Sequence, residues 1–397
     1  MRRKSQIVSF IIAITWLLVG VGFCFPQNIS VDSLNKALIA DAGLSSVDLE
    51  SIRKGKVVTR LLPSTDKREV AVLGITRIDL PVGVVRESFR TAIRKQEKKT
   101  TLQSGSFGDP VDFEDIANLK MEEKDLRDLK DCRIKKCNVR LSASMIRRFS
   151  ENIDWKKDSS RSEAEDLYRR ILVEYVRDYL SHGDEALMEY EGKKKTVSLK
   201  AEQNSLKQNI FWLKRFSPEL DSYLSDFPNS GREDITNTFR WSKIKFGLKP
   251  VVIISHTATY KEQDGDTSQI IIISKQIYSS RYIDSSLGFT ALVSFPKEDG
   301  NFETYIIFAN YSRASALASR LGGLARGLVE KEAKGKLKNI LGDTRRGAAL
   351  LIANQANSPE TYHPAGYREL FTRNAGIIFG VSIFVLVVIV VIRNRRG

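Results

Sequence analysis

Hydrophobic and polar residues recur with a helical period near the start of the chain and with a strand-like period directly afterwards. Leu34, Leu38 and Ile39 keep helical spacing, so residues 30–54 are expected to be helical. Two β-branched runs follow, at 56–62 (KVVTRLL) and 69–80 (EVAVLGITRIDL), and they predict two strands separated by a Pro-Ser-Thr-Asp turn. Pro81 then opens a predicted helix, since its missing N–H would have no partner in a first helical turn.

Residues 110–230 are predicted to be mostly helical. The clearest helix covers 163–180, where large side chains recur every four residues and form one apolar stripe: Leu167, Ile171, Tyr175 and Tyr179. A stripe of this kind is typical of a packed core rather than a cofactor pocket, so it is assigned no ligand.

From residue 238 onward the period changes to that of strands. Four apolar runs predict strands at 251–260, 269–278, 287–295 and 302–310. Asp-Gly pairs, a strong signal for a tight hairpin turn, lie between the first two runs and between the last two. Because consecutive hairpins pair neighbouring strands in opposite directions, we expect an antiparallel sheet.

The segment after these strands predicts a long C-terminal helix that packs on the sheet. Ser312 can cap this helix, and four leucines share one face: Leu317, Leu321, Leu324 and Leu328. Glycines at 322, 323 and 327 lie beside them. Since a helical glycine costs up to about 1 kcal/mol relative to alanine, their density predicts a close approach to another surface or space for a ligand.

Both ends of the chain carry an apolar run bounded by basic residues. Residues 1–24 resemble a signal peptide, although an uncleaved run of this length could also span a bilayer. Residues 375–392 (AGIIFGVSIFVLVVIVVI) carry no charge and are long enough for a transmembrane helix. Residues 342–374, which contain two prolines, are interpreted as a stalk, and 393–397 as a tail.

The basic clusters at both ends indicate the topology. Such clusters stay on the cytoplasmic side, so we expect a single-pass membrane protein with a cytoplasmic C-terminus. The bulk of the chain would be extracytoplasmic, which means periplasmic in a Gram-negative host. Gly376 and Gly380 form a GxxxG pair that either marks a dimer face or simply faces lipid, and we favour the second interpretation.

Charge narrows the set of partners. The chain carries a formal net charge of +15, part of which lies in the terminal clusters. A basic domain beside a bilayer is most simply explained by anionic headgroups nearby. Nucleic acid is not expected as a partner, because the chain is predicted to be exported and contains no nucleic-acid-binding motif. No cofactor is indicated.

Cysteine usage agrees with export. Cys132 and Cys137 lie in DCRIKKC, where a disulfide can close a small ring in an oxidising compartment. Free thiols are the second interpretation. A metal site is the least favoured, because the chain has only three histidines and none lies near this segment.

The order of predicted elements is a strand, a proline-started helix, a helical stretch, an antiparallel meander and one long helix. This order resembles the helix-grip fold of START-type and polyketide-cyclase-like domains. The resemblance rests on 75–89 (ITRIDLPVGVVRESF) and on 238–341, and it covers roughly 56–341. Segments 241–252 and 274–288 also resemble a bacterial membrane-anchored family. An α+β fold is therefore implied, with a sheet wrapped on the last helix, a helical insertion at 110–230 and a separate helical segment at 25–55.

Several residues could contact a ligand held between such a sheet and helix. His256 shares a strand face with Ile254 and Ala258, so it points inward as a ligand contact or, as we favour, as a core histidine. A polar cluster interrupts the apolar strands, and its candidate contacts are Ser274, Gln276, Tyr278 and Arg281. Arg281 could hold a carboxylate or phosphate bidentately, but an exposed loop explains the cluster equally well. In the helix-grip interpretation Gly323 leaves space for the ligand.

Three classes of function follow from these features. The leading one is a membrane-tethered domain that binds a lipid or another hydrophobic molecule. The second is a structural or interaction protein that binds an envelope partner. The third is a hydrolase built on Ser274, His256 and Asp284, which we disfavour because the chain has no GxSxG motif and sequence proximity does not establish the geometry of a triad.

Overall fold

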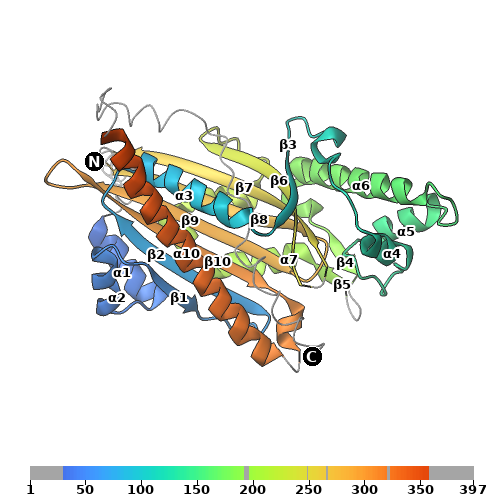
Figure 1. Cartoon of the computed structure of the whole chain (residues 1–397), viewed down its shortest axis with the longest axis horizontal. Helices are drawn as coiled ribbons and strands as arrows, with labels where there is room; N and C mark the ends of the chain where they lie inside the picture. The colour runs from blue at the N-terminus through green and yellow to red at the C-terminus, as the bar shows by residue number, and fades with distance from the viewer. Residues whose placement is uncertain (1–29, 192–195, 248, 265–266, 320–321, 357–397) are drawn as a thin grey trace, which may run out of the picture.

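The computed structural model describes residues 30–191, 196–247, 249–264, 267–319 and 322–356, which form an α+β fold around one large sheet (Figure 1). The predicted signal peptide and the predicted transmembrane helix at 375–392 lie outside these residues. Within the described ranges, no helix is both long and apolar enough to cross a membrane.

Eight strands form the sheet in the order β1-β2-β10-β9-β8-β7-β6-β3, and every neighbouring pair is antiparallel. The prediction of an antiparallel sheet is thus confirmed. Its strands are β1 (Val58–Leu62), β2 (Glu69–Ile78), β3 (Thr101–Phe107), β6 (Ile235–Ile244), β7 (Val251–Asp264), β8 (Thr267–Ser279), β9 (Ser285–Pro296) and β10 (Phe302–Arg313). The short strands β4 (Glu189–Glu191) and β5 (Thr196–Ser198) form a separate hairpin.

Two helices cover one face of the sheet, side by side in Figure 1: α3 (Val82–Glu97) and the long C-terminal helix α10 (Gly322–Ala356). Their apolar side chains share one core with strand residues such as Val72, Ile272 and Ile306. A long C-terminal helix packed on an antiparallel sheet is consistent with the helix-grip arrangement.

The middle of α10 packs directly on β2 at Gly74. A Cβ at this position would lie 2.5 Å from Leu337 Cγ, so only glycine allows the helix to approach so closely. Helix α10 meets α3 in the same way at Gly347, where a Cβ would lie 2.4 Å from Ser88 Oγ. That hydroxyl donates to the Thr344 carbonyl at 2.7 Å. This part of the interface is solidly packed.

The predicted apolar face of the C-terminal helix is wrong in two respects. Leu328 is 42% exposed, and a Cβ on Gly323 or Gly327 would meet no atom within 4 Å. The face that packs on the sheet instead carries Val329, Ala333, Leu337, Ile340 and Leu341. The close approaches therefore occur at glycines farther along the helix and in the sheet, not at the early glycines.

The start of α10 also differs from the prediction. Ser312 still belongs to β10, and Leu317 lies in the short 3-10 helix η3 (Ser315–Ala318), so neither begins the helix. Leu321 and the side chain of Leu324 lie outside the described residues. At its other end α10 continues to Ala356, so the first part of the segment interpreted as a stalk is helical.

The opposite face of the sheet is covered by two groups of helices. One group packs over β2, β8, β9 and β10: α1 (Val31–Ala42), α2 (Ser46–Arg53), α7 (Leu199–Asn209), α8 (Phe211–Phe216) and α9 (Pro218–Asp226). The other packs over β6, β7 and the end of β8: α4 (Glu123–Lys130), α5 (Ala143–Asn152) and α6 (Ser160–His182), with the short 3-10 helices η1 (Phe113–Ile116) and η2 (Gly183–Ala186) nearby. The segment 110–230 is mostly helical, as predicted, with the short strands β4 and β5 inside it, and it forms most of a second layer.

A disulfide joins Cys132 to Cys137 in the loop between α4 and α5, as predicted. We expect the Cys132→Ser/Cys137→Ser double variant to lose about 2 kcal/mol of unfolding free energy, because a ring this small restricts the unfolded chain modestly. Denaturant unfolding of the full chain in detergent micelles measures this loss.

Reductant provides the matched control for this prediction. It should lower the unfolding midpoint of the wild-type protein and leave that of the double variant unchanged. Stoichiometric thiol labelling of both cysteines in protein purified without reductant from its native compartment would contradict the bridge.

Candidate functional site

Polar side chains follow one row across four strands, on the face that α3 and α10 cover. In this row Ser106 of β3 lies opposite Arg240, Arg240 opposite Ser255, and Ser255 opposite Gln276. The next row contains Thr257, which lies opposite Ser274 with 3.5 Å between their hydroxyl oxygens. The face is thus polar here, although it is apolar on either side of these rows.

Strand alternation explains how these residues reach that face. Ser255 alternates with Ile253, and Ser274 with Ile272, and both isoleucines belong to the core under α3 and α10. Opposite Ile254 and Ser255 of β7, the strand β8 contains one extra residue. Because of this extra residue, Tyr278 points to the face covered by the second helical layer, whereas Gln276 points to the α3/α10 face.

Gln276 is the most unusual member of the row. Its side chain is 2% exposed, yet neither its amide nitrogen nor its amide oxygen has a hydrogen-bond partner among the described residues. Leaving a buried polar group unpaired costs about 1–3 kcal/mol, and such groups in native proteins call for an explanation. A bound molecule with its own polar group would satisfy both atoms.

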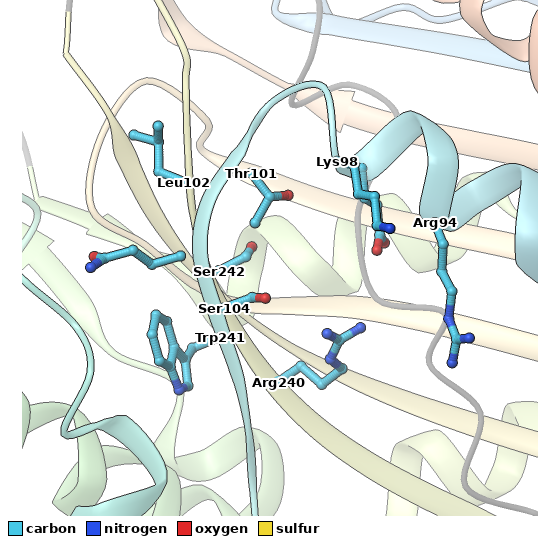
Figure 2. A pocket seen from close by; sticks show the side chains of 10 residues that line it. Arg94, Lys98, Thr101, Leu102, Ser104, Arg240, Trp241 and Ser242 are labelled. Carbon is cyan, nitrogen blue, oxygen red and sulfur yellow. The ribbon is translucent and has the colours of Figure 1, made fainter.

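A hollow of about 350 Å³ opens beside the same row, between the C-terminal turn of α3, the edge strand β3 and its neighbour β6. In Figure 2, Arg94 reaches it from α3, Lys98 from the turn that follows α3, and Arg240 from β6. Glu97 and Trp241 also line it. The hollow therefore continues the polar row at the edge of the sheet.

Burial shapes the electrostatics of this hollow. Burial raises the pKa of Glu97, although the charges of Arg240 and Arg94 oppose the shift. Burial likewise lowers the pKa of Arg240, against the attraction of Glu97. The charged forms of both side chains are therefore poorly solvated.

His256 lies on the other face of the sheet, among the helices of the second layer. Its Nε2 lies 2.8 Å from Asn237 Oδ1 and its Nδ1 lies 3.0 Å from the Tyr179 hydroxyl, while Phe227 and Phe239 pack on the ring. Burial, with a smaller effect of the nearby Lys275 ammonium, lowers the pKa of His256 to about 3. These surroundings match the neutral core histidine that the sequence analysis favoured, with hydrogen-bond partners at both ring nitrogens.

The side chains of Tyr278 and Arg281 also contact other side chains of the protein. The Tyr278 hydroxyl lies 2.9 Å from that of Tyr168 in the second layer. Arg281 is buried between two carboxylates of α4, with its Nη2 2.8 Å from Asp125 Oδ1 and 3.0 Å from Asp128 Oδ2. The guanidinium expected to hold a ligand anion is occupied by the protein itself.

The residues that the sequence suggested as ligand contacts therefore do not form one site. Ser274 and Gln276 share the α3/α10 face, whereas His256 and Tyr278 lie on the opposite face. Gly323 is exposed near the start of α10. A hydrolase triad is not assembled, because Ser274 and His256 lie on opposite faces and the Asp284 carboxylate accepts from Ser315 Oγ at 2.7 Å.

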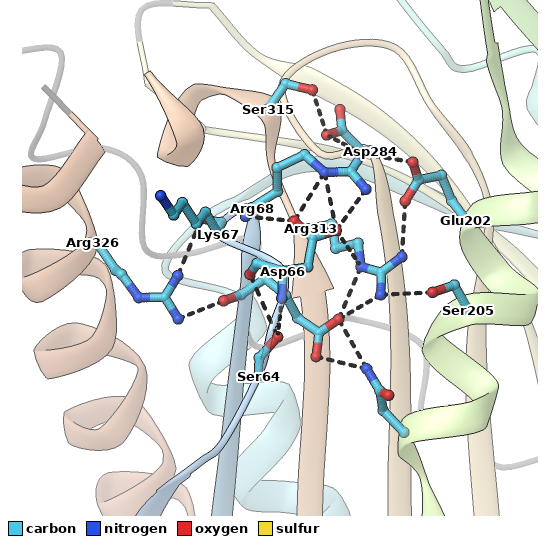
Figure 3. A network of polar contacts seen from close by, with 12 residues as sticks. Ser64, Asp66, Lys67, Arg68, Glu202, Ser205, Asp284, Arg313, Ser315 and Arg326 are labelled. Atoms are coloured by element: carbon cyan, nitrogen blue, oxygen red, sulfur yellow. Dashed lines mark hydrogen bonds and ion pairs between the residues drawn. The ribbon is translucent and has the colours of Figure 1, made fainter. Parts of the chain in front are cut away.

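A buried ion cluster joins the layers at the start of β2 and the end of β10 (Figure 3). Arg313 donates from Nε to Glu69 Oε2 at 2.9 Å and from Nη1 to Glu202 Oε2 at 3.1 Å. Arg68 also pairs with Glu202, and Arg326 of α10 donates to the Glu69 carbonyl at 2.8 Å. The cluster thus connects the sheet to α7 and α10, and its charged groups are occupied with one another.

The described residues offer no group of three or more His, Cys, Asp and Glu side chains arranged to hold a metal ion. No model of a known protein family matches the chain, and no curated protein matches it significantly. The hollow and the polar row are therefore interpreted from their own chemistry.

His256 provides a test of this assignment. The pKa of His256 in the folded protein lies below the value of about 6.5 for a histidine in an unfolded chain. As the pH falls from about 6.5 towards 3, the unfolded chain therefore protonates this imidazole while the folded protein does not. Stability is thus lost across this window, and His256→Phe should reduce the loss. Proton NMR of the full chain in micelles should show a His256 ring signal that does not shift between about pH 8 and about pH 5. A midpoint near 6 would contradict this assignment.

Proposed function

We propose that this chain is a non-catalytic ligand-binding domain, tethered outside the cytoplasm by residues 375–392. Its ligand is a lipid or another hydrophobic molecule that carries a polar group. The ligand lies on the α3/α10 face of the sheet, beside Gln276. The observation that carries this proposal is the buried Gln276 amide, which has no partner among the described residues.

The surroundings of Gln276 suit a molecule with both polar and apolar parts. Hydroxyls lie beside it in the sheet, from Ser255 across the strand pair and from Ser274 two residues before it. Isoleucines flank the polar rows on both sides, at 253 and 272. The isoleucines would contact a hydrocarbon part of the ligand, and the amide would hydrogen-bond its polar part.

One observation favours the alternative, a structural or interaction protein that binds an envelope partner. At Gly74 and Gly347 the helix α10 packs without space for even a methyl group. A ligand would therefore lie toward the polar rows and the C-terminal turn of α3, and not under the middle of α10.

The first prediction measures bound ligand and stability together. Solvent extraction and mass spectrometry of the purified full-length protein should yield a stoichiometric hydrophobic compound. Gln276→Leu should reduce its amount severalfold. It should also raise the unfolding midpoint of protein freed of ligand by detergent exchange, because the variant no longer buries an unpaired amide. Gln269→Leu is the matched control, since Gln269 lies on the same strand but faces the other way and bonds Glu262; its ligand content should not change.

Two results would refute ligand binding on this face. One is a wild-type protein without extractable ligand. The other is a Gln276→Leu variant that keeps its ligand and only melts earlier, as expected if the amide is part of a solid core.

The tether makes a separate prediction about topology. A reporter that is active only in the cytoplasm should work when fused after Gly397, and one that is active only outside should work when fused near Ser358. These outcomes follow from the basic residues at both ends of the chain. The opposite activity at either junction would refute the topology.

A further inference from the structure

The hollow at the end of α3 has a charge pattern that the proposed ligand site does not yet explain. Three cationic side chains, Arg94, Lys98 and Arg240, line it together with the single carboxylate of Glu97. Within the described part of the chain, none of the three cations forms an ion pair, although most arginines elsewhere in the fold do.

Two buried atoms in the side chains that line the hollow also lack hydrogen-bond partners among the described residues. Glu97 Oε1 and Arg240 Nε are both buried and accept or donate no hydrogen bond among the described residues. The charges of the two side chains attract each other, but within the described residues no salt bridge joins them. Both side chains line the hollow, yet among the described residues no hydrogen bond joins them.

A ligand could complete both groups if it were anionic and carried a donor. A guanidinium binds phosphate or carboxylate through paired N–H groups, and a second cation on α3 strengthens the site. The free Glu97 oxygen requires an N–H or O–H donor on the ligand. Phosphate or carboxylate alone would satisfy Arg240 but would leave Glu97 unpaired and repelled.

We infer that this hollow binds a zwitterionic group in which a phosphate or carboxylate lies next to an ammonium, as in phosphoethanolamine. Arg240 and Arg94 hold the anion, and Glu97 accepts from the ammonium. This inference deepens the proposed function, because the same strand row leads from Arg240 through Ser255 to Gln276. The hollow then takes the headgroup of the molecule whose hydrophobic part lies along the sheet.

Binding can be followed without an acyl chain, which separates this inference from the extraction experiment. Isothermal titration calorimetry of the full-length protein with O-phosphorylethanolamine measures this binding directly. Phosphorylcholine is the matched probe, since it has the same charges but no N–H donor. We expect phosphorylethanolamine to bind at least tenfold more tightly than phosphorylcholine.

Variants assign the contacts. Arg240→Gln should weaken both probes tenfold or more, whereas Glu97→Gln should remove most of the preference for phosphorylethanolamine. Arg148→Gln is the control, because Arg148 is an exposed arginine that pairs with Glu174 on a distant helix; it should change neither affinity. Circular dichroism of each variant confirms that it is folded.

The source of the group is resolved with short-chain lipids. Tighter binding of dihexanoyl phosphatidylethanolamine than of free phosphorylethanolamine identifies a lipid headgroup, and the reverse order identifies a free small molecule; both support the inference. Equal affinity for ethanolamine and choline probes, no binding of either, or an unchanged affinity in folded Arg240→Gln would overturn it. If extraction yields no lipid while the preference for phosphorylethanolamine is observed, the proposed lipid-binding function is refuted. The inference that the hollow binds a zwitterionic group is then still supported.

Discussion

The structure depends on one physical constraint: the central strands are apolar on both faces, so both faces must be covered. In β8 the run Ile270 to Ile273 alternates between the core under α3 and α10 and the core on the opposite side. A strand with this pattern cannot leave one face in water without exposing several large side chains. The second helical layer is therefore required by the sheet, and the sheet with α10 alone would not be a complete domain.

This constraint also explains the ion cluster around Arg313 and Glu69. Both side chains are buried at the point where β2, β10 and α7 meet, and an unpaired charge at such a place would be strongly destabilising. Each is surrounded by partners from distant segments, including Glu202 and Asn209 from the second layer. The cluster fixes how the two layers meet, and it leaves no free charge for a ligand.

Much of the fold could be predicted from the sequence because it is encoded locally. The four long strands, the helix after Pro81 and the helix at 163–180 follow from periodicity, and the hairpin signals gave the antiparallel order. Strand β3 was missed because TLQSGSF is polar at most positions and pairs at an edge. The start of the last helix was misplaced because Ser312, which could cap a helix, continues β10 in a buried position.

The site was less accessible from the sequence, because strand alternation does not tell which face a ligand occupies. His256 and Gln276 both lie in apolar strands, yet one faces the second layer and the other faces α3. The extra residue in β8 separates Tyr278 from Gln276, and no local signal marks it. Arg281 lay in a plausible polar cluster, but its carboxylate partners on α4 are more than 150 residues away in sequence. The cationic hollow depends on α3 and β6, which meet only in the fold.

The central claim is that the ligand lies on the α3/α10 face and not within the second helical layer. Hydrogen–deuterium exchange of the full-length protein, before and after removal of its ligand by detergent exchange, tests this claim most directly. The account predicts faster exchange after extraction in β7 and β8 near Ser255 and Gln276 and at the C-terminal turn of α3. Exchange in α6 around Tyr179 should stay unchanged. A change confined to α6, or no change anywhere after a ligand has been removed, would contradict the account.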